Sequence, residues 1–93
     1  MDFEWDEWKR LENLDKHGLD FVEAEEMFAG PMLVALDTRK DYGEDRWIGL
    51  GMSQGRVLIV LFTERNDGTT IRVFSLRKAL KHEQKAYEKI LQD

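Results

Sequence analysis

Basic residues recur along one face of a helix that the sequence predicts near the N-terminus. Lys9, Asn13 and Lys16 are spaced i, i+4, i+7, and His17 ends the same helix. Lysine side chains can hold phosphate, and histidine exchanges protons near neutral pH. Spacing alone still favours a solvated face, with a histidine suited to the helix C-terminus, over a binding face.

Two further charged groups lie at the ends of predicted elements. Glu64 and Arg65 follow the apolar run of residues 57–62, whereas Arg77 and Lys78 open a helix that we expect to start near residue 75. Cations are unfavourable at a helix N-terminus. The placement of Arg77 and Lys78 there suggests that these two residues hold an anion together with the free N–H groups of the helix.

A carboxylate interrupts the apolar arc of the last predicted helix. Glu83 lies in the middle of that arc, one turn before Tyr87. Burying a carboxylate without a partner is very costly, so we expect an arginine beside it. A structural ion pair is the simpler interpretation, and a pair at the rim of an active site is the alternative. The candidate partners are Arg46, Arg65, Arg72 and Arg77.

The cysteine, histidine, carboxylate and glycine residues of the chain do not predict a metal or cofactor site. The chain has no cysteine, and its two histidines, His17 and His82, lack metal-ligand spacing. The carboxylates of residues 37–45 lack the order of a calcium loop and predict a solvated acidic loop. Gly49 and Gly51 fall within predicted antiparallel strands, where glycines indicate bulges or close backbone contact. We therefore expect no metal and no cofactor.

Length and charge limit the class of protein. A chain of 93 residues predicts a single domain, residues 1–93. The net charge of −5 argues against nucleic-acid binding, but it is unevenly distributed. Residues 1–26 carry 10 acidic and 3 basic residues (−7), whereas residues 63–93 carry 5 and 7 (+2). No secretion signal or membrane-length apolar segment is present, so a cytoplasmic protein is expected.

Hydrophobic periodicity predicts an α+β fold of the order β-α-α-β-β-β-β-α, with helices packed on a small antiparallel sheet. Trp8, Leu11 and Leu14 recur at helical spacing as the apolar face of the first helix. The run 57–62 is apolar throughout, as in a central strand. The expected strands are residues 3–5, 32–36, 46–52, 57–62 and 69–75, and the expected helices are residues 6–17, 20–29 and 75–91.

Several blocks of the chain together resemble BrnT-type ribonuclease toxins, from residue 3 to about residue 88. They are Phe3-x-Trp5-Asp6-x-x-Lys9-x-x-x-Asn13-x-x-Lys16-His17-Gly18-x-x-Phe21-x-x-Ala24, Gly51-x-Ser53-x-Gly55-Arg56-x-Leu58, Thr63-Glu64-Arg65, Ser75-x-Arg77-Lys78-Ala79 and Glu83-x-x-x-Tyr87. The resemblance implies a RelE-like fold and the toxin half of a bacterial type II toxin–antitoxin pair. It also implies an antitoxin that neutralises the toxin and binds the operator DNA, which the toxin contacts only through that partner.

The resemblance further implies a metal-independent endoribonuclease that cuts RNA by 2′-hydroxyl attack and inhibits translation and growth. This chemistry needs proton transfer and stabilised phosphoryl charge. Arg65 and Arg77 are the expected phosphate clamps, and His17 or Glu64 is the expected general acid or base. The expected RNA-binding residues are Lys9, Lys16 and Lys78, and the expected supporting residues are Asn13, Glu83 and Tyr87.

The same sequence features also allow a second function. The chain would then be a toxin-fold module with weak or no catalysis, which binds the DNA-binding antitoxin and regulates its operon. In either case we expect the antitoxin to cover a basic face. One candidate is the lysine stripe of the last predicted helix, which consists of Lys78, Lys81, Lys85 and Lys89.

Overall fold

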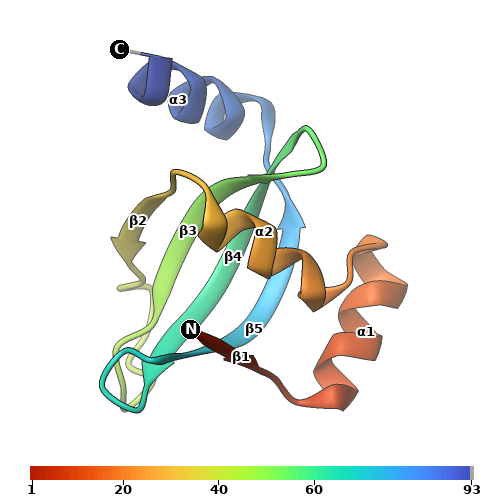
Figure 1. The fold of residues 1–93 in the computed structure, drawn as a ribbon, viewed down its shortest axis with the longest axis vertical. Helices are drawn as coiled ribbons and strands as arrows, with labels where there is room; N and C mark the ends of the chain where they lie inside the picture. The colour runs from red at the N-terminus through yellow and green to blue at the C-terminus, as the bar shows by residue number, and fades with distance from the viewer. Residues whose placement is uncertain (93) are drawn as a thin grey trace.

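A five-stranded sheet organises the computed structural model, which describes residues 1–92 (Figure 1). The elements follow the order β1 (Asp2–Glu4), α1 (Glu7–His17), a 3₁₀ turn η1 (Phe21–Glu23), α2 (Ala24–Ala29), β2 (Leu33–Leu36), β3 (Trp47–Ser53), β4 (Arg56–Arg65), β5 (Thr70–Lys78) and α3 (Lys81–Gln92). The predicted α+β class and the predicted element order are confirmed.

The sheet is mixed, so the prediction of a purely antiparallel sheet is wrong. The strand order is β1-β5-β4-β3-β2, and β2 to β5 form antiparallel neighbours. At the edge, β1 pairs parallel with residues 70–72 of β5. No hairpin links these two strands, because most of the chain lies between them. Their relative direction is therefore set by tertiary packing and not by a turn.

Two tight turns join the three strands β3, β4 and β5. Gln54 and Gly55 join β3 to β4, and Asn66, Asp67 and Gly68 join β4 to β5, all with positive φ angles. Glycine, asparagine and aspartate adopt positive φ at low cost, so the local sequence favours both hairpins, although Gln54 has to adopt the less favourable left-handed conformation. The turns place β4 in the centre of the sheet, where Ile59 and Val60 are buried on opposite faces.

Helix α2 crosses one face of the sheet in front of β3 and β4 (Figure 1). The core between them contains Phe21, Ala24 and Met27 from the helical layer, packed with the β4 residues Leu58 and Val60. Close approach of the layers explains two glycines in β3. A Cβ atom at position 49 would lie 2.5 Å from the Met32 Cε, and one at position 51 would lie 3.3 Å from the Met27 Cβ. Of the two explanations predicted for these glycines, the structure supports close contact, made mostly by the side chains of Met27 and Met32.

The boundary between the last strand and the last helix differs from the prediction. Residues 75–78 continue β5 and pair with residues 58–61 of β4, and the helix begins only at Lys81. Leu76 fitted the helical arc in the sequence, but it is completely buried in the sheet core. A register shift beside Leu61 and Phe62 breaks the simple strand alternation and hides the strand in the sequence pattern.

Helix α3 stands away from the sheet at the C-terminal end (Figure 1), so its predicted apolar arc does not pack as expected. Leu80 and Ile90 are 56% and 58% exposed. Tyr87 is the buried residue of this helix among those described, and its hydroxyl donates to the Pro31 carbonyl oxygen at 2.8 Å. The predicted lysine stripe is shorter than expected, because Lys78 belongs to β5.

Helix α1 lies beside the edge of β5, and its contact with that strand is polar. The side chain of Asn13 is buried, and its Nδ2 donates to the carbonyl oxygens of Leu19 and Leu76 at 3.1 and 2.9 Å. Its Oδ1 accepts from the Leu76 N–H at 3.1 Å. The amide therefore replaces a neighbouring strand at this point of the edge.

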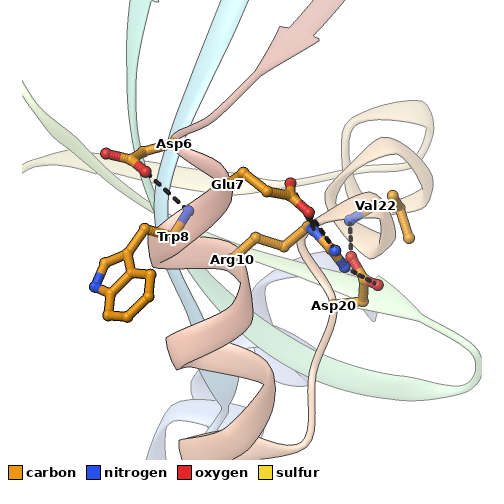
Figure 2. Close-up of polar contacts among 6 residues, drawn as sticks. All are labelled: Asp6, Glu7, Trp8, Arg10, Asp20 and Val22. Carbon is orange, nitrogen blue, oxygen red and sulfur yellow. Dashed lines mark hydrogen bonds and ion pairs between the residues drawn. The ribbon is translucent and has the colours of Figure 1, made fainter.

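The predicted apolar face of α1 does not face the core. Trp8 is 74% exposed and Leu11 is 48% exposed. The helix is instead fixed at its first turn, where Asp6 accepts from the Trp8 N–H, and Arg10 pairs with both Glu7 and Asp20 (Figure 2). The first two contacts stabilise the start of the helix, the Arg10–Asp20 pair joins it to the following segment, and the Asn13 bonds set its rotation, which leaves its large apolar residues toward solvent.

Replacing Asn13 should test this attachment. The Asn13→Ala variant leaves the N–H and carbonyl of Leu76 and the carbonyl of Leu19 without their partner, so we expect a loss of about 2 to 4 kcal/mol in the free energy of unfolding. Urea denaturation of purified protein measures this loss. Glu12→Ala, an exposed change one residue away, is the control and should stay within about 0.5 kcal/mol. Equal stability of the two variants would contradict the proposed attachment.

Candidate functional site

A hollow of about 160 Å³ lies between α1 and β5. Its walls bring together cations, an imidazole, an aromatic ring and a hydroxyl group. The lining residues are Lys9, Glu12, Asn13, Lys16, His17, Phe74 and Ser75. The predicted helix face of Lys9, Asn13, Lys16 and His17 therefore converges on one site.

The positions of the side chains that line this hollow depend on the attachment of α1 to β5. Asn13 forms its floor, and the hydrogen bonds to Leu76 fix the helix beside the strand. The Lys9 Nζ then lies 5.5 Å from the centroid of the Phe74 ring. Asn13 is thus a positioning residue, because its amide is occupied by backbone partners.

A second, smaller hollow of about 50 Å³ meets the first one at Ser75. Two arginines line it together with apolar side chains of the sheet, and the full set is Arg39, Ile48, Ile59, Leu61, Ser75 and Arg77. Ser75 therefore lies between the cations of α1 on one side and Arg39 and Arg77 on the other. The sequence named Ser75 only within the block Ser75-x-Arg77-Lys78-Ala79, and it gave no signal for Arg39.

Phe74 is flanked by cations from two distant segments. The Arg46 guanidinium carbon lies over the Phe74 ring at 3.8 Å from its centroid, and over the Tyr42 ring at 4.3 Å. Such cation–π contacts order an arginine without neutralising it. The Arg46 Nε also donates to Glu44 at 3.4 Å. Sequence reasoning missed this group, because Arg46 and Phe74 meet only through the sheet register.

Arg77 forms the ion pair that Glu83 was expected to need. Both guanidinium Nη atoms donate to the Glu83 carboxylate at 3.0 Å, and the Leu80 N–H donates to the same group at 2.7 Å. The Arg77 guanidinium holds the pKa of the Glu83 carboxyl below its usual range. One of the four candidate arginines is thereby identified, and the pair fixes the start of α3 against the end of β5.

Tyr87 lies away from both hollows. Its hydroxyl is bonded to the Pro31 carbonyl, and burial raises the pKa of the phenol. Tyr87 therefore anchors α3 to the segment before β2.

The structure does not bring Arg65 close to Arg77. Arg65 lies opposite Thr70 at one end of the β4–β5 pair, and Arg77 lies opposite Ile59 near the other end. Six residues of strand separate these positions, which corresponds to about 20 Å. Glu64 lies beside Arg65, whose guanidinium pairs with Glu44 at 3.3 Å. A single phosphate therefore cannot contact both arginines.

The expected anion site at a helix N-terminus is also wrong. Arg77 and Lys78 lie on β5, two or more residues before α3 begins. Their backbone N–H groups belong to strand geometry and do not converge as they do in the first turn of a helix. Lys78 is exposed at the end of the strand, opposite Leu58.

The segment of residues 37–45 contains a buried carboxylate, contrary to the expected solvated loop. The Asp37 side chain is 1% exposed and accepts from Arg39 at 2.9 Å through two nitrogens. The Tyr42 hydroxyl donates to it at 2.9 Å. Hydrogen bonds from Arg39 hold the pKa of the Asp37 carboxyl well below its usual range. This network positions Arg39 at the second hollow.

Metal ligation has no candidate site in residues 1–92. No group of three or more His, Asp or Glu residues in that part of the chain is arranged to hold an ion. The helices of the same residues are also too short or too polar to cross a membrane.

Fold and site together define a small α+β protein with cations, an imidazole and an aromatic ring at one edge of its sheet. The family of ribonuclease toxins, BrnT, of type II toxin–antitoxin systems matches residues 5–83, and the chain belongs to this family. The matched segment includes α1, both hollows and the Arg77–Glu83 pair. A search of curated proteins finds no significant match.

The Asp37 network should make the free energy of unfolding fall as the pH becomes acidic. Because the folded pKa of Asp37 lies below its ordinary value of 3.8, its contribution is complete above about pH 5 and is lost as the pH falls below about 4. Asp37→Asn should therefore be less stable than the wild type at pH 7, and the difference should shrink at pH 3. Urea midpoints at both pH values measure it.

The matched control for this prediction is Asp41→Asn. Asp41 is exposed, and its carboxylate accepts a hydrogen bond from the Gly43 N–H. The side-chain oxygen of an asparagine can accept the same bond. We expect this variant to follow the wild type at both pH values. A gap between Asp37→Asn and the wild type that is equal at pH 7 and pH 3 would show that ionisation of Asp37 contributes nothing.

Proposed function

We propose that this chain is a metal-independent endoribonuclease toxin with a RelE-like fold, which binds RNA in the hollow between α1 and β5. The observation that supports the proposal is the convergence of Lys9, Lys16 and His17 beside Phe74 and Ser75. The membership in a ribonuclease toxin family supplies the reaction class. Cleavage of cellular RNA in the cytoplasm would lower translation and stop growth.

The proposed reaction needs only side chains and the RNA itself. A base removes the proton of a 2′-hydroxyl, and that oxygen forms a bond to the adjacent phosphorus. The bond from phosphorus to the 5′-oxygen breaks, and this oxygen takes up a proton from an acid. The products are a 2′,3′-cyclic phosphate and a 5′-hydroxyl. We assign one of the two proton transfers to His17, since its imidazole borders the hollow beside Lys9 and Lys16.

The charged residues of the hollow suit a phosphate backbone. Lys9 and Lys16 come from the same face of α1, and both point to the space that His17 borders. Their charges would stabilise the additional negative charge on the phosphoryl oxygens. Phe74 adds an apolar ring, which is typical of sites where an unpaired base stacks. The hollow thus offers contacts to the backbone and to a base.

Arg77 is the favoured arginine clamp, since it reaches the second hollow next to Ser75. A bidentate guanidinium suits phosphate, but this one is held by Glu83. RNA would therefore have to compete with Glu83 for it. Lys78, at the adjacent exposed position, is a further backbone contact in this proposal. Glu64 and Arg65 are less favoured, because about 20 Å of strand separates them from Arg77.

The local charge supports RNA binding although the whole chain is acidic. Net charge of −5 predicts weak nonspecific attraction for a polyanion. Lys9 and Lys16 line one hollow, and Arg39 and Arg77 line the other, with Ser75 common to both. Field strength close to a site depends on the nearby charges more than on the total. We therefore propose binding that is localised to this edge of the sheet.

A type II toxin implies an antitoxin partner. We propose that this antitoxin carries the operator DNA-binding activity and that the toxin reaches DNA only through it. In the free toxin, carboxylates already hold several arginines, as Glu83 holds Arg77 and Glu44 contacts Arg46 and Arg65. This pairing favours the second candidate function, a weakly active module whose main role is to bind the antitoxin and regulate its operon.

Substitution of His17 tests the catalytic role of the hollow. His17→Ala should slow cleavage of a single-stranded RNA by roughly 100-fold or more, because one proton transfer loses its catalyst. Purified protein is incubated with labelled RNA in the presence of a chelator, with growth after induction as a second measurement. His82→Ala is the control, since His82 is exposed in the first turn of α3. Equal activity of both variants would contradict the role of His17.

Wild-type protein that folds, binds RNA and leaves it uncut would instead support the weakly active module. Cleavage that stops in chelator would overturn the metal-independent mechanism. The mass of the product ends separates 2′-hydroxyl attack, which leaves a cyclic phosphate, from hydrolysis by water.

Substitution of the two arginines tests the clamp. Arg77→Ala should lower cleavage by about 100-fold if its guanidinium holds the transition-state phosphate. Arg65→Ala should change the rate by no more than about threefold, because it lies at the other end of the strand pair. Glu83→Gln removes the competing charge and separates loss of the ion pair from loss of the clamp. If both arginine variants retain cleavage and growth inhibition, the clamp assignment is wrong.

A further inference from the structure

Trp8 is the most exposed large apolar side chain among the described residues, at 74%. Figure 2 shows its indole pointing away from the Glu7–Arg10–Asp20 contacts that fix the first turns of α1. With Leu11 and Glu12 it lines a shallow hollow of about 250 Å³ on the outer side of the helix. A half-exposed leucine beside an exposed tryptophan is unusual on a soluble surface and typical of an interaction site.

The attachment of α1 keeps this hollow uncovered. At about 100° per residue, Trp8 projects about 140° away from Asn13, the residue that binds β5. The side of the helix that carries Trp8 therefore cannot reach the sheet while Asn13 holds Leu76. Any group that covers this apolar surface must therefore come from outside residues 1–92.

The charges around the hollow distinguish between possible occupants. Glu12 lines the hollow, and Asp15 lies one turn beyond Leu11 on the same side of the helix. Both carboxylates are exposed, and neither forms an ion pair within residues 1–92. The residues that line this outer hollow include no cation to offset the carboxylates, as Lys9 and Lys16 do in the other hollow, so an RNA phosphate would be repelled here, as would the same acidic surface of a second copy. An apolar side chain accompanied by lysine or arginine is complementary to this rim.

We infer that the Trp8–Leu11 hollow is the anchoring site of the antitoxin, which inserts an apolar side chain there and places basic residues over Glu12 and Asp15. The inference rests on the proposed function, in which the toxin has an antitoxin partner, and it places that partner on the acidic outer side of α1 in place of the lysine stripe of α3. The N-terminal 26 residues of this chain, with a net charge of −7, complement such a partner. Exposed tryptophans are frequent energetic centres of protein interfaces.

The same position would connect partner binding with inhibition. Glu12 lines both the Trp8–Leu11 hollow and the hollow that contains Lys9, Lys16 and His17. A polypeptide seated against Trp8 therefore lies at the mouth of the proposed RNA site. Its presence would exclude RNA sterically, with no change in the conformation of the toxin.

The test uses the full-length toxin and its cognate antitoxin, purified separately. Trp8→Ala and Leu11→Ala should each weaken antitoxin binding, by roughly 30-fold for Trp8→Ala. Val34→Ala is the matched control, because Val34 is 50% exposed on β2, at the edge of the sheet opposite to β1. Titration calorimetry gives the dissociation constants, and circular dichroism confirms that the variants fold. RNA cleavage by free Trp8→Ala should equal that of the wild type.

The outcomes separate this inference from the proposed ribonuclease. Weaker antitoxin binding by Trp8→Ala supports the anchor even if the wild type cuts no RNA. Unchanged antitoxin binding overturns the anchor even if the wild type is an active ribonuclease. Loss of RNA binding by Trp8→Ala with normal antitoxin binding would assign the hollow to a nucleobase. A dimer of the free chain that Trp8→Ala dissociates would assign it to a second copy.

Discussion

The amide of Asn13 is the contact on which the arrangement of this protein depends. Strand β1 covers only residues 70–72 of β5, so Leu76 lies on an open edge of the sheet. Asn13 satisfies both the N–H and the carbonyl of Leu76, and it also binds the carbonyl of Leu19. A buried backbone group without a partner is costly, so this one side chain fixes both the position and the rotation of α1.

The rotation of α1 divides its surface into two sites of opposite charge. Lys9, Lys16 and His17 border the hollow beside β5, whereas Trp8 and Leu11 face solvent among carboxylates. The negative net charge of the chain therefore differs from the local charge at the candidate RNA site. The outer side of the same helix is acidic, and its carboxylates favour a basic partner over a polyanion.

Part of the candidate site could be predicted from local sequence, and part could not. The spacing of Lys9, Asn13 and Lys16 predicts one helix face, because helical periodicity is a local property. The need of Glu83 for an arginine also follows from its residue type, but the choice of Arg77 among four arginines does not. The contacts of Phe74 with Lys9 and Arg46 join three separate segments through the sheet, and no local spacing encodes them.

By itself the sequence determined the α+β order, the two positive-φ hairpins and the central apolar strand, since each depends on neighbouring residues. Only the tertiary structure decided the parallel pairing of β1, the extension of β5 through Lys78 and the outward direction of Trp8. These features depend on strand register and on one buried amide. Such contacts join residues as far apart as 13 and 76, where periodicity carries no information.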